Sequence, residues 1–269
     1  MISGIPASLW LVGCGNMAGA MLRRWVDSGT IDPSIVTVID PGAARVPAGV
    51  RHLAALPADG APEAVMLGIK PQMLDAVAPA LAPRIAGVPL LLSILAGVEA
   101  ASLAQRFAAG AIVRAMPNLP VALGHGAVAL YGVDPQGPAG RAAAALMAPL
   151  GLVEWIAEES LLDAVTALSG SGPAFVYRFI DALAAGGAAL GLPQDQAMRL
   201  AVATVEGAAM LAAGAEASPA ELADRVASKG GSTREGLDVL DRDAALARLL
   251  AETLRAARDR NVALAAAAR

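Results

Sequence analysis

Six residues near the N-terminus, Gly13-Cys14-Gly15-Asn16-Met17-Ala18, fit the pattern G-x-G-x-x-A directly after an apolar block. In this pattern the first glycine makes a tight turn, the second lets the backbone approach a pyrophosphate, and the small last residue lets the next helix pack on the sheet. Unpaired N–H groups at the helix N-terminus then favour the phosphates. Because a strand pattern precedes the loop and a helix pattern follows it, we interpret it as a dinucleotide site rather than a glycine turn without a ligand.

An acidic residue, Asp40, ends the second predicted strand. A carboxylate at this position accepts hydrogen bonds from the ribose 2′-OH of NAD and repels the 2′-phosphate of NADP. Arg45 follows a few residues later and would either reach a 2′-phosphate or remain a solvated loop charge. The expected cofactor is therefore NADH or NADPH, and Asp40 favours NADH.

A second glycine-rich segment, Gly230-Gly231-Ser232-Thr233, lies far along the chain. Ser232 and Glu235 have the S-x-x-E spacing of a capping box, which predicts a helix start. The two glycines before it expose backbone N–H groups where a carboxylate would dock. The alternative is an ordinary helix start with a flexible glycine lead-in.

The elements that must position these residues differ between the two halves of the chain. Short runs of Val, Ile and Leu in the first half are typical of parallel strands covered on both faces. We predict strands at Leu9–Val12, Ile35–Ile39, Val65–Ile69, Leu90–Ile94, Ile112–Ala115 and Ala127–Leu130, and helices at Ala18–Asp27, Met73–Leu81, Ala100–Phe107 and Arg141–Leu150. Helix patterns alone follow, at Phe175–Leu190, Gln194–Ala213, Pro219–Val226 and Ala244–Leu264. The predicted fold class is α/β: a Rossmann-like doubly wound sheet over residues 1–157, then an all-α domain over residues 158–269 that completes its core by dimerisation.

Composition excludes several classes of protein. A net charge of -4 without a basic cluster argues against nucleic acid as a partner. The longest uncharged apolar run, Ile85–Val98, is shorter than the roughly 20 residues of a membrane span, so no membrane span is expected. A single cysteine, Cys14, indicates a reducing, cytoplasmic location. His52, His125 and Cys14 lie far apart, so no metal site is expected.

Several blocks follow the glycine loop in a specific order. They are Gly68-Ile69-Lys70-Pro71-Gln72, Ser93-Ile94-Leu95-Ala96-Gly97-Val98, Arg114-Ala115-Met116-Pro117-Asn118-Leu119-Pro120, Ser169-Gly170-Ser171-Gly172-Pro173-Ala174-Phe175 and Ser228-Lys229-Gly230-Gly231-Ser232-Thr233. In this order and spacing they resemble pyrroline-5-carboxylate reductases along nearly the whole chain. The resemblance implies an oxidoreductase of proline biosynthesis that reduces 1-pyrroline-5-carboxylate, a small molecule, to L-proline with NAD(P)H. It also implies a homodimer, or a higher homo-oligomer, built on the helical domain.

The resemblance also assigns site residues. Expected cofactor-binding residues are Gly13, Gly15, Asn16, Met17, Ala18, Asp40, Gly68, Ile69, Lys70, Pro71, Ala96, Gly97, Met116, Pro117 and Asn118. Expected substrate-binding residues are Glu159, Ser228, Gly230, Gly231, Ser232 and Thr233, with the Thr233 hydroxyl as the catalytic contact to the ring nitrogen. Glu159 is also interpretable as an acidic residue in the first turn of a helix.

Three positions depart from the family pattern. Asp40 stands where members of the family commonly carry residues that suit a 2′-phosphate. Leu119 replaces a threonine near the cofactor, and Lys229 replaces a proline. The alternatives are therefore a reductase of another cyclic imine or ketimine acid, and a non-catalytic dinucleotide sensor. A hydroxy acid substrate, as in the related β-hydroxyacid dehydrogenases, is a further alternative. Those enzymes are expected to use a lysine of the second domain as the acid, and the absence of a lysine between Lys70 and Lys229 argues against this alternative.

Overall fold

The computed structural model describes residues 4–42 and 45–267. The chain divides into two compact units, Met1–Ser171 with Ala257–Arg269, and Gly172–Ala256. The first unit thus extends past the expected boundary after residue 157, because Leu162 packs with Met116 and Ala129 of the sheet. The division into residues 1–157 and 158–269 stays a prediction.

The first unit is built on one eight-stranded sheet. Its strands are β1 (Leu9–Val12), β2 (Val36–Ile39), β3 (Arg51–Leu53), β4 (Ala64–Leu67), β5 (Leu90–Ser93), β6 (Ile112–Met116), β7 (Gly126–Tyr131) and β8 (Gly151–Trp155). They lie in the order β3-β2-β1-β4-β5-β6-β7-β8. Every neighbouring pair is parallel except β6 and β7. The short link between these two strands, which contains the 3-10 helix η4 (Leu119–Leu123), leaves no room for the helical crossover that a parallel pair needs.

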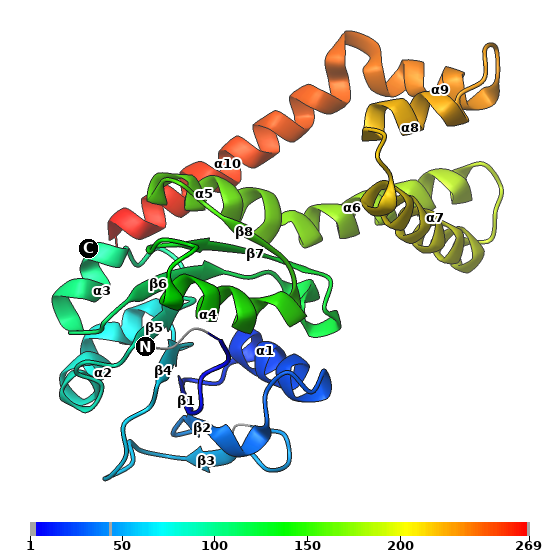
Figure 1. Ribbon diagram of the computed structural model, residues 1–269. Helices are drawn as coiled ribbons and strands as arrows, with labels where there is room; N and C mark the ends of the chain where they lie inside the picture. The colour runs from blue at the N-terminus through cyan, green and yellow to red at the C-terminus, as the bar shows by residue number, and fades with distance from the viewer. Residues whose placement is uncertain (1–3, 43–44, 268–269) are drawn as a thin grey trace. The chain divides into compact units, whose positions relative to one another are not determined.

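Helices cover both faces of this sheet (Figure 1). The helices are α1 (Asn16–Asp27), α2 (Leu74–Leu81), α3 (Ala100–Arg106) and α4 (Pro138–Met147). Side chains of α1 and α4, such as Trp25 and Leu146, close one core cluster, and side chains of α2 and α3, such as Leu81 and Leu103, close the other. Two buried clusters on opposite faces are what a doubly wound sheet requires.

All six predicted strands are confirmed; Leu9–Val12 has the predicted ends, and the ends of the others differ by at most two residues. The sequence reading missed β3 and β8. Strand β3 has only three residues, and the exposed residues Arg51 of β3 and Leu152 and Glu154 of β8 break any buried apolar run. A strand of this kind exists because a neighbouring strand is available for pairing, which local sequence does not reveal.

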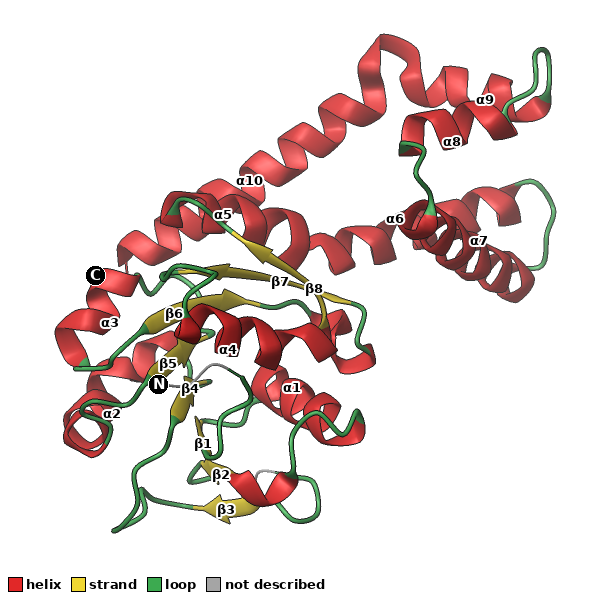
Figure 2. Ribbon diagram, viewed as in Figure 1, coloured by secondary structure: helices red, strands yellow, loops and turns green. Residues whose placement is uncertain are grey.

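The second unit is helical (Figure 2). It contains α6 (Gly172–Ala189), α7 (Gln194–Gly214), α8 (Pro219–Val226), α9 (Ser232–Asp241) and the first part of α10 (Ala245–Ala267). A short helix α5 (Leu162–Val165) and a π-helical turn, Thr166–Gly170, precede α6 in the first unit. The expected helices are confirmed. For α9 the sequence predicted only a helix start, and the structure shows the whole helix.

The predicted capping box at Ser232 and Glu235 is wrong. Gly231 is the N-cap of α9, and Ser232 is the first helical residue, so its side chain makes no capping hydrogen bond. The capping box lies instead at α8, where the Ser218 hydroxyl accepts from the Glu221 N–H, and the Glu221 carboxylate accepts from the Ser218 N–H at 2.7 Å. The hydrogen bonds that the Glu221 carboxylate accepts from the Ser218 N–H and from the Ser218 hydroxyl lower its pKa.

Among the described residues, α7 is long and apolar enough to cross a membrane by length and composition. No span was expected, because the longest uncharged apolar run, Ile85–Val98, is too short, and α7 itself contains the charged residues Arg199 and Glu206. Few of its residues are buried within the chain, so α7 presents an exposed apolar surface.

Candidate active site

The glycine loop joins β1 to α1, and its first glycine, Gly13, has no room for a side chain. Gly13 has φ +85°, and a Cβ there would lie 2.7 Å from the Ile69 backbone nitrogen. A Cβ at Gly68 would lie 2.8 Å from the Cβ of Ala18. Gly15, the N-cap of α1, is exposed and would meet nothing within 4 Å. Crowding thus fixes the turn, while the space at Gly15 is open to a pyrophosphate.

The Asp40 carboxylate is held by backbone N–H groups on both oxygens. Its Oδ2 accepts from Cys14 N–H at 2.7 Å, and its Oδ1 accepts from Gly42 N–H at 2.8 Å. The carboxylate therefore has a fixed position beside the glycine loop.

Burial, followed by the charge of Asp40, raises the pKa of the Cys14 thiol, and the charge of Arg23 opposes this shift. The Cys14 thiol therefore ionises less readily than an ordinary cysteine thiol.

A cavity of about 410 Å³ opens where the carboxyl ends of β1, β2 and β4 meet. The strand order reverses at β1, between β2 and β4, and ligands of doubly wound sheets bind at such switch points. The expected cofactor residues that line it are Gly13, Gly15, Asp40, Gly68, Ile69 and Lys70. Its size and its mixture of apolar walls with one fixed carboxylate suit the adenosine part of a dinucleotide.

Other expected cofactor residues lie outside this cavity. Asn16 is exposed at the start of α1, whereas Met17 packs partly against the core and Ala18 is buried. Pro71 and Gly97 line a second hollow of about 270 Å³ between α2 and α3, and Ala96 is exposed on the loop beside it. These residues stay predicted contacts.

The Met116-Pro117-Asn118 segment is buried at the end of β6. The Asn118 amide donates to the Ser169 carbonyl at 3.0 Å and accepts from Ala127 N–H at 2.8 Å. Asn118 thereby joins β7 to the π-helical turn, a feature that is often found at functional sites. The Asn118 side chain, which the sequence assigned to the cofactor, thus makes hydrogen bonds within the protein. Its contact with the cofactor stays a prediction.

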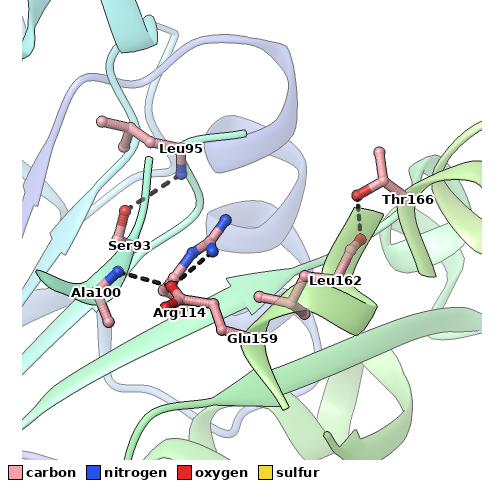
Figure 3. A network of polar contacts seen from close by, with 7 residues as sticks. All are labelled: Ser93, Leu95, Ala100, Arg114, Glu159, Leu162 and Thr166. Atoms are coloured by element: carbon pink, nitrogen blue, oxygen red, sulfur yellow. Dashed lines mark hydrogen bonds and ion pairs between the residues drawn. The ribbon is translucent and has the colours of Figure 1, made fainter. Parts of the chain in front are cut away.

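Glu159 is engaged by protein groups. Its Oε1 accepts from Arg114 Nη1 and from the backbone N–H of Ala100, each at 2.7 Å. Figure 3 shows both donors directed at this carboxylate. The resemblance implied that Glu159 binds substrate, and the alternative was an acidic residue in the first turn of a helix. Glu159 does begin a 3-10 helix, Glu159–Leu161. The substrate contact stays a prediction.

The remaining expected substrate residues lie on the loop between α8 and α9 and in the first turn of α9. Ser228, Gly230, Ser232 and Thr233 are exposed in the chain, and Gly230 has φ +70°. An ion pair between Arg234 and Asp224 at 2.7 Å joins the two helices across this loop. The loop therefore has a fixed base and an exposed tip.

Sequence reasoning missed several residues around the cavity. Ala54, Ala55 and Leu56 follow the unpredicted β3, and Met73 and Val77 belong to the 3-10 and helical turns after Lys70. It also assigned no role to Arg114, which is 6% exposed. A charged residue inside an apolar strand was the available signal, because a buried arginine requires a partner.

Comparison with known proteins gives two matching families. Residues 159–264 match pyrroline-5-carboxylate reductase dimerisation, and residues 8–97 match NADP oxidoreductase coenzyme F420-dependent. The pyrroline-5-carboxylate reductase of Synechocystis is 40% identical over 243 residues, which are 87% of this chain and 90% of that protein.

Solved structures agree in fold. A pyrroline-5-carboxylate reductase from Coxiella burnetii matches with a TM-score of 0.83 and 28% identity, over 95% of this chain and 97% of that one. The Plasmodium falciparum pyrroline carboxylate reductase with NADP bound matches with a TM-score of 0.80 and 22% identity, over 98% and 100% of the two chains. With the switch-point cavity and the ordered motifs, these matches show that the chain belongs to the pyrroline-5-carboxylate reductase family.

Proposed function

We infer that this protein reduces 1-pyrroline-5-carboxylate to L-proline with NAD(P)H, the last step of proline biosynthesis. The observation that carries the inference is the dinucleotide-type cavity, built on Gly13, Gly15 and Asp40, in a chain of this family. We also propose that the reaction takes place in the cytoplasm.

For hydride transfer to an imine, the main task of the protein is to position the imine carbon against the nicotinamide. A bound NAD(P)H would supply the hydride that the imine carbon accepts, while the protonated ring nitrogen takes up the C=N π electrons. The chain would bind the substrate carboxylate through N–H groups at Gly230–Ser232. Thr233 Oγ1 would hydrogen-bond the ring nitrogen and orient the imine.

The cofactor preference that we propose is for NADH. Two N–H groups hold the Asp40 carboxylate beside the cavity, so it cannot turn away from a 2′-phosphate. NADP is the molecule bound in the Plasmodium structure, so the preference is open to direct test. The ratio of kcat/KM for NADH to that for NADPH should exceed one and fall by about tenfold or more in Asp40→Ser, since one lost repulsion of about 1.4 kcal/mol gives a factor of ten. A wild-type ratio below one would refute the preference.

We further propose that the protein is a homodimer or a higher homo-oligomer built on its helical residues. Exposed apolar side chains are dense on α6 and α7, including Phe179, Leu200 and Leu211. This region lies within the match to the family's dimerisation domain. Leu211→Glu should lower the mass measured by light scattering, because a charge cannot be buried unpaired in an interface. Glu216→Gln, at an exposed position after α7, is the control that should leave the mass unchanged.

The decisive experiment measures oxidation of NADH and NADPH in the presence of pyrroline-5-carboxylate. Thr233→Ala should lower kcat/KM by about 10- to 100-fold, because a hydrogen bond to a charged group is worth roughly 1.5–3 kcal/mol. Thr253→Ala, which removes an exposed hydroxyl bonded only to its own helix, is the matched control. No turnover by wild-type protein that still binds a cofactor would instead favour another imine or the sensor.

A further inference from the structure

The loop between β5 and α3, Ile94–Glu99, is attached to the sheet near both of its ends. Near its start, the Ser93 hydroxyl accepts from Leu95 N–H at 3.3 Å. Just after its end, Glu159 Oε1 accepts from Ala100 N–H, the first residue of α3. Figure 3 shows both attachments, together with Arg114 and Glu159. The loop carries Ala96 and Gly97, both expected to contact the cofactor.

Arg114 gives the second attachment its strength. It lies on β6, in register with Ser93 of β5, and its side chain is 7% exposed, against 24% for Glu159. A guanidinium so buried requires a negative partner, and Glu159 is the partner, at 2.7 Å. The Glu159 carboxylate thus has its position set by a buried charge and in turn fixes an N–H group at the N-terminus of α3, where a negative charge is favourable.

Three segments that are distant in sequence therefore converge on one carboxylate oxygen. Resting on the proposed function, we propose that Glu159 and Arg114 are positioning residues that hold the Ile94–Glu99 loop in the geometry in which it binds the cofactor. Glu159 then acts on the reaction through the loop, without touching the substrate. This differs from the substrate contact that the sequence resemblance implies.

The test compares cofactor binding with substrate use in Glu159→Ala, Glu159→Gln, Arg114→Ala and Arg114→Lys. The Kd of NADH, measured by fluorescence without substrate, should rise about tenfold in Glu159→Ala, because a misplaced contact loop weakens binding. Glu159→Gln keeps an acceptor for Ala100 N–H and should lie between wild type and Glu159→Ala. Arg114→Lys keeps the charge and should retain tighter binding than Arg114→Ala. The KM for pyrroline-5-carboxylate, at saturating cofactor, should stay within about twofold of wild type.

The control uses the ion pair that joins α3 to α2. Arg106, at the end of α3, pairs with Asp75, whose side chain is 80% exposed. Asp75→Asn should leave the Kd of NADH unchanged, because an exposed pair holds the helix weakly. Thermal unfolding shows whether each variant folds. If Glu159→Ala does not fold, Glu159→Gln is used for the test instead.

The outcomes are distinguishable. A raised KM for the imine with an unchanged Kd would make Glu159 a substrate ligand and overturn the proposal. A lowered Tm with neither constant changed would overturn it too, leaving a purely structural ion pair. A wild-type protein that binds NADH but does not reduce the imine would refute the proposed reaction, while a raised Kd in Glu159→Ala would still support the positioning role.

Discussion

The two compact units bury their apolar residues to very different extents. The sheet unit closes two clusters of large side chains, among them Trp25, Phe107 and Leu81, on opposite faces of its strands. In residues 172–256, all of which the structure describes, the buried apolar residues are Ala184, Ala197, Ala201 and Ala227. Large apolar side chains there, such as Leu190 and Leu211, are mostly exposed.

The contrast separates two ways of stabilising a fold. Buried area supplies the main favourable free energy, at about 25 cal/mol per Å². The sheet unit obtains it within one chain. Close packing of α6 on α7 through alanines gives little such area, so the helical unit depends on apolar surface that only a partner would cover.

The largest expected effect comes from truncating a core residue of the sheet unit. Leu81, which is 0% exposed, should lose about 2–5 kcal/mol of unfolding free energy on Leu81→Ala, measured by denaturant titration. Leu190, 90% exposed, should lose less than about 0.5 kcal/mol on Leu190→Ala. A comparable loss at Leu190 would mean that the assembled protein buries it.

Two glycines of positive φ provide the next comparison. Alanine at either Gly13 or Gly230 should cost about 1–2 kcal/mol for the left-handed backbone. Gly13→Ala should cost more, because its Cβ also meets Ile69, and it should weaken NADH binding, whereas the position at Gly230 is open. Calorimetric melting and fluorescence titration check the two effects. Equal costs would show that the glycine loop relaxes around a methyl group.

The capping residues give a smaller effect. Ser218→Ala should lower stability by about 0.5–2 kcal/mol, since it removes the N-cap of α8. Ser232→Ala should leave the Tm almost unchanged, because Ser232 makes no capping bond. The reverse result would restore the capping box expected at Ser232.

The smallest effect is in the pH dependence of Cys14. A thiol pKa raised in the folded state means that its contribution to stability is complete below the ordinary thiol pKa and is lost as pH rises through the folded value. Asp40→Asn removes a charge that raises this pKa, so alkylation of Cys14 should begin at a lower pH than in wild type. An unchanged alkylation profile would show that burial alone sets the pKa.

The sequence by itself determined the features that depend on neighbours along the chain. The buried runs of β1 and β4, the glycine loop that follows β1, and Asp40 at the end of β2 all come from local pattern, because a strand–turn–helix unit is set by adjacent residues. The long helices of the second unit were predictable for the same reason.

Only the tertiary structure decided which distant residues meet. Glu159 contacts Arg114 and Ala100 across 45 and 59 residues, and Asn118 contacts Ser169 across 51. No local pattern encodes such pairs, because they depend on the order and register of strands in the sheet. Strand β3 and the N-cap of α9 escaped prediction likewise, since pairing with β2 creates the first and the backbone conformation of Gly231 sets the second.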